Sequence, residues 1–170
     1  MSYTIRTVRP DDAAGVLAML ASVVTDPVNN LMREPGEPIF TEEEEREFLA
    51  GQKMRPDWCG FVAVAESGEI IGMVTIDGKR RPAVRHRGEL GVSVVSGWRG
   101  QGVGRALVER AIACARESGV FTRIELIVLA RNETAIRLYE SLGFQHEGRR
   151  QRGMLRNGEY LDDLMMALLL

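Results

Sequence analysis

The sequence predicts an α/β fold in which a mixed, mostly antiparallel sheet of about seven strands carries helices on both faces. Apolar residues alternate with polar ones in several short runs, which is the period of a half-buried strand. Between these runs, apolar residues recur every three or four positions, which is the period of a helix packed on a core. At 170 residues the chain has the length of one domain, so residues 1–170 are expected to form a single domain.

The N-terminal third predicts one strand and two helices. Residues 4–8 alternate, and Pro10 then begins a helix that has aspartates in its first turn, one of them a candidate cap. Residues 27–38 contain three prolines and are expected to be a loop. Residues 41–44, Thr-Glu-Glu-Glu, have the pattern of a capping box, so they begin a second helix that ends near Lys53.

The same patterns predict the elements of the rest of the chain. Residues 61–65 and 70–76 alternate on either side of a short turn, which predicts a β-hairpin. Residues 123–130 form a further strand, and Asn132 caps the helix after it. Residues 157–158, Asn-Gly, are a hairpin turn signal, so two closing antiparallel strands are expected in the C-terminal tail.

Composition and charge are those of an ordinary globular protein. The chain is 45% apolar, and its formal net charge of -2 gives no general electrostatic reason to bind nucleic acid. No signal peptide or membrane-spanning run is recognisable, so we expect no membrane association and a cytoplasmic location. Cys59 and Cys114 are far apart and have no histidine cluster, which indicates neither a zinc site nor a disulfide framework and fits a reducing cytosol.

Residues 77–87 are rich in basic side chains, among them Lys79. Such a segment is most often an exposed loop, although it could attract the phosphates of a cofactor or an acidic partner. His86 and His146 are not spaced as metal ligands, so no metal site is expected.

The stretch over residues 88–107 has the pattern of a strand, a glycine-rich turn and the start of a helix. Residues 90–95 alternate and are rich in β-branched side chains, which predicts the strand. The glycines that follow are Gly97, Gly100, Gly102 and Gly104. The first amides of a helix have no acceptor within the helix, and glycines let a ligand approach them closely, so this turn suits a phosphate group. Arg99 and Arg105 flank the turn and could add charged contacts.

Two common phosphate-binding motifs do not fit this turn. A Walker A loop requires Lys followed by Ser or Thr after its last glycine, where this chain has Arg105-Ala106. A dinucleotide fingerprint requires a third glycine in the slot of Arg105, and Glu125, at about the distance of a ribose-binding acid, lies near the start of its strand instead of the end. A purely structural turn is the remaining alternative, but it needs fewer glycines and arginines.

The spacing Arg99-x-x-Gly102-x-Gly104 resembles the pyrophosphate loop of the GCN5-related N-acetyltransferases, the GNAT family. A second stretch, residues 132–144, matches the N-x-x-A-x-x-L-Y-x-x-x-G-F block that follows the fifth strand in that family. The two motifs come in the order that the family has, so together they are a specific signal. The resemblance implies the GNAT fold and acetyl-CoA as the cosubstrate.

The resemblance also implies which residues hold the cosubstrate. The amides of the turn would bind the pyrophosphate, and the pantetheine arm would pair with the preceding strand as an added strand does. An amide near Val94 would serve the oxyanion, and splaying of this strand from residues 123–130 is a feature of the family. The implied cofactor-binding residues are Val92, Val94, Val95, Arg99, Gly100, Gln101, Gly102, Val103, Gly104, Arg105, Asn132 and Tyr139.

The implied catalytic residues are an acid and a base. By resemblance, Tyr139 donates a proton to the leaving thiolate, whereas by pattern alone it would be a core aromatic. Glu89 is the first candidate for the base, because many relatives carry a carboxylate at the start of this strand. Glu125 is the alternative, although the slot five residues before Asn132, a glutamate in some relatives, is Ile127 here. Either glutamate could instead be a surface acid or an ion-pair partner, and ordered water could relay the proton.

The predicted function is that of an acetyl-CoA-dependent N-acetyltransferase, which moves the acetyl group to a primary amine of a small molecule such as an amino acid by direct attack in a ternary complex. By resemblance, residues 27–38 and the helix over residues 41–53 build the acceptor pocket. One alternative is a protein N-terminal acetyltransferase of the ribosomal-protein type, and another is a non-catalytic module that senses acyl-CoA. A dinucleotide-dependent oxidoreductase ranks below both. Homodimers are common among relatives, which makes a homodimer a further expectation.

Overall fold

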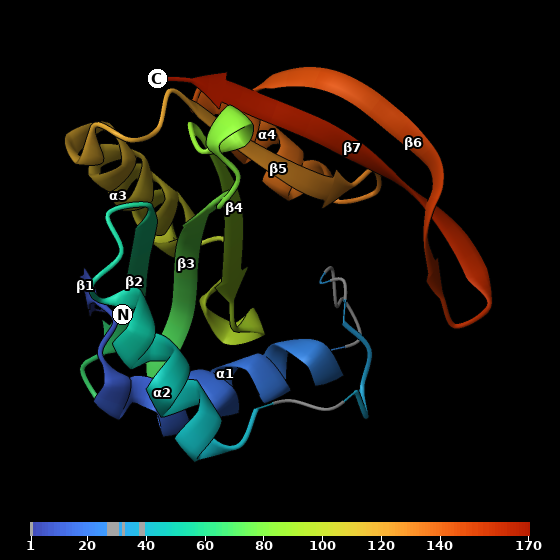
Figure 1. The fold of residues 1–170 in the computed structure, drawn as a ribbon. Coiled ribbons are helices and arrows are strands. Elements are labelled where there is room, and N and C mark those ends of the chain that lie inside the picture. Colours follow the sequence, from blue (N-terminus) through green and yellow to red (C-terminus); the bar gives the residue numbers. More distant parts are fainter. Residues whose placement is uncertain (1, 27–30, 32, 38–39) are drawn as a thin grey trace.

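A computed structural model describes residues 2–26, 31, 33–37 and 40–170. In these residues a seven-stranded sheet has the order β1-β2-β3-β4-β5-β7-β6 (Figure 1), and every neighbouring pair is antiparallel except β4 and β5. The strands are β1 (Tyr3–Thr7), β2 (Trp58–Ala65), β3 (Ile70–Gly78), β4 (Arg87–Val94), β5 (Arg123–Leu129), β6 (Gln145–Arg156) and β7 (Glu159–Leu169). The predicted mixed, mostly antiparallel sheet is therefore confirmed.

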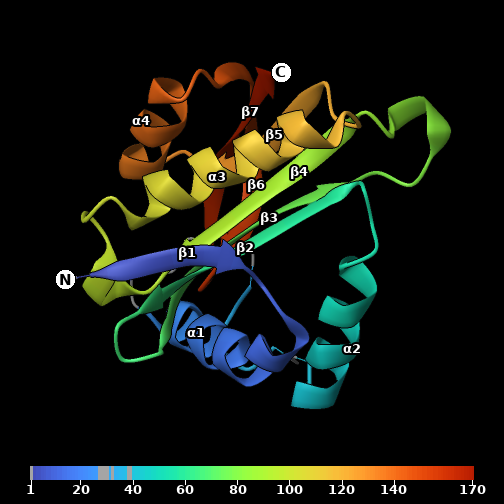
Figure 2. The same ribbon diagram turned by 90° about the vertical axis from the view of Figure 1, so that its left-hand side faces the viewer.

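Helices cover both faces of the sheet, as Figure 2 shows: α1 and α2 lie on one face, and α3 and α4 lie on the other. Their bounds are α1 (Ala13–Thr25), α2 (Glu42–Gln52), α3 (Val103–Ser118) and α4 (Glu133–Ser141). Among the helices of the described residues, none is long and apolar enough to cross a membrane.

Of the helix caps predicted for α1 and α2, one forms and one does not. The capping box at α2 forms as predicted, because the Glu44 amide donates to Thr41 Oγ1 at 3.3 Å and the Thr41 amide donates to Glu44 Oε2 at 2.7 Å. At α1 the predicted aspartate cap does not form. The carboxylate of Asp12 accepts two hydrogen bonds from Arg6 of β1 and one from the Arg9 amide, all at 2.7 Å. It therefore joins β1 to the 3-10 turn Pro10–Asp12 that precedes α1 and does not accept from the first amides of α1.

The core beneath α3 is built from the stripe that the sequence indicates. Val103, Leu107, Ala111 and Ala115 are all at most 1% exposed and pack on β2, β3 and β4. Gly72 of β3 allows this close approach, since a Cβ there would lie 3.1 Å from Leu107 Cδ1. This packing fixes the start of α3 beside the end of β4.

β4 and β5 pair over three residues only and then separate. Arg87–Glu89 of β4 lie parallel to Arg123–Glu125 of β5, and beyond them no register joins the two strands. β4 stays paired with β3 up to Val94, whereas β5 stays paired with β7 up to Leu129, so each strand follows its other neighbour away from the pair. Figure 1 shows the resulting divergence of the two strands. Because the last parallel register pair is Glu89 with Glu125, one edge of β4 is open from Leu90 onward.

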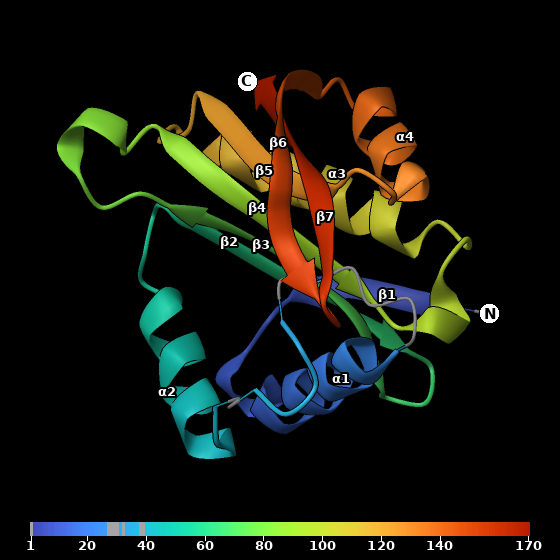
Figure 3. The ribbon, with the colours of Figure 1, turned by 90° about the vertical axis from the view of Figure 1, so that its right-hand side faces the viewer.

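The β6–β7 hairpin bounds the opening on the other side. Figure 3 shows it crossing in front of β4 toward α1. At its tip, Arg156 donates to the carbonyl of Leu31, so the hairpin contacts the segment that follows α1. Half of the loop expected over residues 27–38 to help form an acceptor pocket lies outside the described residues, namely residues 27–30, 32 and 38.

The expectation about the cysteines is wrong. Cys59 of β2 and Cys114 of α3 form a disulfide, with Cα atoms 6.2 Å apart. The two cysteines meet because α3 packs across β2. The guanidinium of Arg110 in α3 lies 4.6 Å from the centroid of the Phe61 ring in β2. Cys114 is one helical turn after Arg110, and Cys59 is two residues before Phe61 on the same face of the strand, so these two side chains also meet. The cytoplasmic location stays a prediction, but free cysteines no longer support it.

We predict that reduction of this disulfide destabilises the protein. It closes a loop with a sequence separation of 55 residues, which corresponds to about 4 kcal/mol of unfolded-state entropy. Denaturant unfolding with and without reductant should show a fall of about 2–4 kcal/mol in the free energy of unfolding on reduction. The Cys114→Ser variant is the control, because reductant should not change its stability; an equal effect of reductant on this variant would contradict the prediction.

Candidate active site

The glycine-rich turn at the start of α3 has the backbone geometry that an anion site requires. Gly100 and Gly102 have φ of 73° and 84°, in the left-handed region that favours glycine, and Gly102 is the N-cap of α3. The first helical hydrogen bond runs from the Ala106 amide to the Gly102 carbonyl at 3.0 Å. The amides of the three residues between therefore have no acceptor within the helix, and the helix dipole adds positive potential to them.

The turn before α3 has open space beside its glycines. A Cβ at Gly97, Gly100 or Gly102 would meet no atom of the described chain within 4 Å. A Cβ at Gly104 would lie 3.8 Å from both Leu138 Cδ2 and Val94 Cγ2, so this glycine lies where α3, α4 and β4 meet. Open amides on the outer side and close packing on the inner side are what a pyrophosphate loop requires.

The arginines that flank the turn have partners within the protein. Arg99 Nε donates to the Val94 carbonyl at 2.9 Å, and its Nη1 lies 3.0 Å from Asp26 Oδ2, just after α1. Arg105 Nη2 donates to Ser141 Oγ of α4 at 2.7 Å. Gln101 closes the turn, because its Nε2 donates to the Gly97 carbonyl at 2.8 Å. The donors of the anion site are thus mainly backbone amides, and these side chains hold the turn in shape.

The open edge of β4 presents backbone groups beside this anion site. The Val95 amide donates to the Ile71 carbonyl at 3.0 Å, so it belongs to the ladder with β3 and is not free for a ligand. Peptide groups alternate in direction along an antiparallel strand, which turns those of Val94 and Val92 toward the side that β5 has left. Of the three valines implied by the sequence, Val92 and Val94 therefore have the geometry to pair with an extended ligand, and Val95 does not.

Tyr139 lies on α4 with its side chain buried. The residue is 7% exposed, its ring packs against Phe144 with centroids 5.7 Å apart, and burial raises the pKa of its hydroxyl to about 12. Among the residues that the structure describes, its hydroxyl has no hydrogen-bond partner. Tyr139 is therefore protonated at neutral pH, as a proton donor must be. Asn132 caps the same helix, since its Oδ1 accepts from the Ala135 amide at 3.3 Å.

The two candidate bases lie side by side where β4 and β5 pair. Glu89 and Glu125 are register partners and share a face of the sheet. Glu125 Oε2 accepts from Arg87 Nη2 at 2.6 Å and from Arg123 Nε at 3.4 Å, and its side chain is 19% exposed. The Glu89 side chain is 54% exposed and forms one ion pair, with Lys79. Glu89 is thus the more accessible of the two carboxylates.

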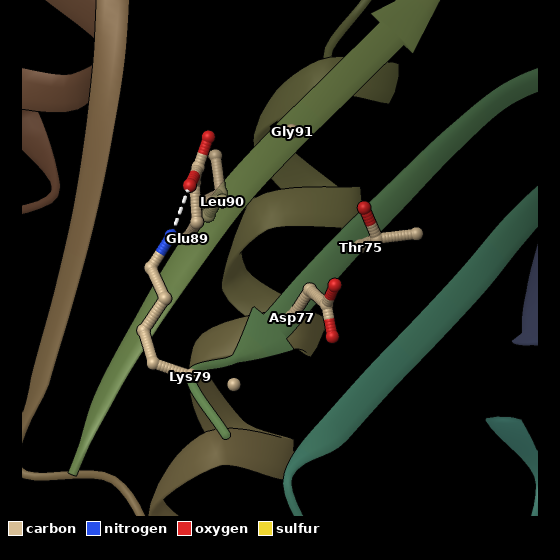
Figure 4. Close-up of a pocket in the computed structure, with 7 residues that line it drawn as sticks. Thr75, Asp77, Lys79, Glu89, Leu90 and Gly91 are labelled. Carbon is tan, nitrogen blue, oxygen red and sulfur yellow. Dashed lines mark hydrogen bonds and ion pairs between the residues drawn. The ribbon is translucent and has the colours of Figure 1, made fainter. Parts of the chain in front are cut away.

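A pocket of about 270 Å³ contains Glu89 (Figure 4). Its lining residues are Thr75, Asp77, Gly78, Lys79, Glu89, Leu90 and Gly91. It lies on the face of β3 and β4 opposite α3, next to the point where β4 and β5 separate. Sequence reasoning missed this pocket, because no local signal shows that Lys79, after β3, reaches Glu89 on the next strand. No group of three or more potential metal ligands was found in the described part of the chain.

An open glycine turn, an open strand edge and a protonated tyrosine have the geometry to accept a long, phosphate-bearing cosubstrate. Comparisons with known proteins show the family of the chain. Residues 25–144 match the model of the acetyltransferase (GNAT) family. The L-amino acid N-acetyltransferase AaaT of Escherichia coli K12 is 39% identical over 113 residues, which are 66% of this chain and 69% of that protein.

Two solved structures resemble the whole chain. The GNAT-family acetyltransferase from Streptococcus pneumoniae has a TM-score of 0.95 at 32% identity, covering 99% of this chain and 100% of that one. A ribosomal-protein-alanine N-acetyltransferase from Brucella melitensis has a TM-score of 0.85 at 28% identity, covering 98% and 99%. The chain belongs to the GNAT family and is an N-acetyltransferase, which confirms the predicted family, fold and enzyme class with acetyl-CoA as the cosubstrate.

We predict that Gly102→Ala weakens the binding of coenzyme A. Its φ of 84° disfavours alanine by about 1 kcal/mol, so the substitution shifts the turn that orients the first amides of α3, although a Cβ there would meet no atom of the described chain within 4 Å. Calorimetry should show at least a tenfold loss of affinity, since tenfold corresponds to about 1.4 kcal/mol.

Gly97→Ala, at the same turn but without a positive φ, is the matched control and should bind coenzyme A nearly as the wild type does. Unchanged affinity in Gly102→Ala, in a protein that is still folded, would place the phosphates elsewhere.

Proposed function

We propose that this protein transfers the acetyl group of acetyl-CoA to the α-amino group of a free amino acid. The observation that carries the proposal is the separation of β4 from β5, which leaves an open edge between the anion site and the pocket that contains Glu89. The 39% identity to an L-amino acid N-acetyltransferase over 69% of its length supports this acceptor class.

The open edge of β4 binds the cosubstrate in this proposal. The amides at the start of α3 bind the pyrophosphate, and the peptide groups of Val92 and Val94 pair with the pantetheine arm. Acetyl-CoA supplies an acetyl group activated as a thioester. The pairing aligns that group along β4, so the acceptor enters from the face that contains the pocket.

The proton transfers are assigned to Glu89 and Tyr139. Glu89 takes the proton of the acceptor ammonium, directly or through a water, because an amine attacks only with its lone pair free. Tyr139 gives its proton to the departing sulfur. The hydroxyl still carries this proton at neutral pH, because its pKa is raised to about 12. In this proposal Glu125 holds β4 and β5 together through its ion pair with Arg87 of β4, and Arg123 of its own strand is its second partner.

A peptide N-terminus is the second candidate acceptor. The 28% identical structural relative is a ribosomal-protein-alanine N-acetyltransferase that matches the whole chain. A peptide N-terminus and a free amino acid present the same α-amino group. The enzyme can therefore distinguish them only through residues that contact the α-carboxylate, which the free amino acid has and the peptide N-terminus lacks.

A screen of acceptors tests the proposed function. Release of free thiol from acetyl-CoA is followed with L-amino acids, polyamines, aminoglycosides and short peptides. We expect amino acids to give kcat/KM at least tenfold above the other classes, which corresponds to about 1.4 kcal/mol of preferential transition-state binding. A preference for peptides would favour the N-terminal alternative, and no turnover with any amine would overturn the proposal.

We predict that Tyr139→Phe lowers kcat by about 100-fold, the usual contribution of a general acid. The ring and its contact with Phe144 remain, so the affinity for coenzyme A should stay within about threefold of the wild type, a free-energy change below 1 kcal/mol. Tyr160→Phe, on the exposed side of β7, is the control and should be fully active. An unchanged rate in Tyr139→Phe would make this residue a part of the core only.

A further inference from the structure

We infer that the ammonium group of Lys79 binds the carboxylate of the acceptor and thereby selects free amino acids over peptide N-termini. This inference rests on the proposed function and names the residue that decides between its two acceptor classes. The argument depends on the ion pair of Lys79 with Glu89, on the place of that pair in the fold and on the shape of the pocket floor.

The ion pair presents two opposite charges next to each other on the wall of the pocket. Lys79 follows β3 and reaches across to Glu89 of β4, as Figure 4 shows, and the two side chains remain 36% and 54% exposed. A free amino acid carries an ammonium and a carboxylate on one carbon. A free amino acid bound beside this ion pair can place its ammonium at Glu89 and its carboxylate at Lys79. Each of the four charged groups then has a neighbour of opposite charge. A peptide N-terminus offers the ammonium alone.

The pair also lies where the reacting amine is needed. β4 and β5 separate directly after Glu89, and the open edge of β4 begins at Leu90, which itself lines the pocket. An ammonium held by Glu89 is thus at the inner end of the edge along which the cosubstrate is aligned. A carboxylate held by Lys79 is directed away from that edge, toward the end of β3.

The floor of the pocket is open because residue 91 is a glycine. Gly91 lies within β4 and has no positive φ, and a Cβ there would make only an ordinary contact, 3.6 Å from Thr75 Oγ1. Neither backbone conformation nor close packing therefore requires glycine, which is a poor strand former. Its effect is to leave room between Glu89 and Thr75 for the body of an acceptor.

Arg55, the cation beside Asp77 of the pocket, is held by carboxylates of the protein. Arg55 bonds Asp57 at 3.0 and 2.9 Å and Asp77 at 2.9 Å, so it neutralises the second acid of the pocket. Among the residues that line the pocket, Lys79 is the one cation. Its four-carbon stem lets the ammonium turn from Glu89 to a ligand without backbone movement.

The test compares acids with amides. L-alanine, L-leucine and L-methionine, and the α-carboxamide of each, are used as acceptors for the wild type, Lys79→Gln and Lys79→Arg. Arg85→Gln, an exposed basic residue of the same connection that does not line the pocket, is the matched control. We expect Lys79→Gln to raise KM for the acids about ten- to hundredfold, the usual effect of losing a charged hydrogen bond, while KM for the amides changes less than threefold. Lys79→Arg should restore most of the affinity for the acids.

The outcomes separate the inference from the proposed function. Equal use of acid and amide by the wild type, or an equal loss for both in Lys79→Gln, would overturn the role of Lys79 and leave amino-acid acetylation in place. An equal loss for both would mean that Lys79 acts only through Glu89. If neither acids nor amides are acetylated but peptides are, the proposed acceptor fails, and the inference fails with it.

Discussion

The three-residue parallel pairing of β4 with β5 is the constraint on which the site depends. A longer pairing would occupy the edge of β4 with hydrogen bonds from β5, and no pairing would leave the sheet as two halves. The ion pair between Arg87 of β4 and Glu125 of β5 ties the strands together at this short junction. Beyond this junction β4 stays paired with β3, and β5 stays paired with β7. Each strand therefore keeps one hydrogen-bonded neighbour where β4 and β5 separate.

Much of the fold could be predicted from the sequence because the signals are local. The alternating run that became β4, the capping box at Thr41 and the hairpin turn at Asn157-Gly158 each depend on residues close in the chain. The glycines before α3 are of the same kind, since a positive φ and an uncapped helix start are properties of a few consecutive residues. The family followed from two such blocks together.

The rest could not be predicted because it depends on contacts between distant segments. The disulfide needs the register of β2 against α3, and Asp12 is recruited by Arg6 of the neighbouring strand. Arg99 and Arg105 have the charge expected near a phosphate, but Asp26 and Ser141 take up their guanidinium groups. Lys79 looked like one of several loop cations until the ladder of β3 and β4 placed it against Glu89.

An anchor made of main-chain donors differs in one respect from a pocket made of side chains. Substitution can abolish a lysine or a glutamate, but every residue except proline retains its amide hydrogen. The proposed pyrophosphate site therefore tolerates sequence drift provided that Gly100 and Gly102 keep their positive φ. The proposed acceptor site at Lys79 and Glu89 consists of side chains and has no such protection, so under our proposal a change of acceptor would begin with substitutions at these two positions.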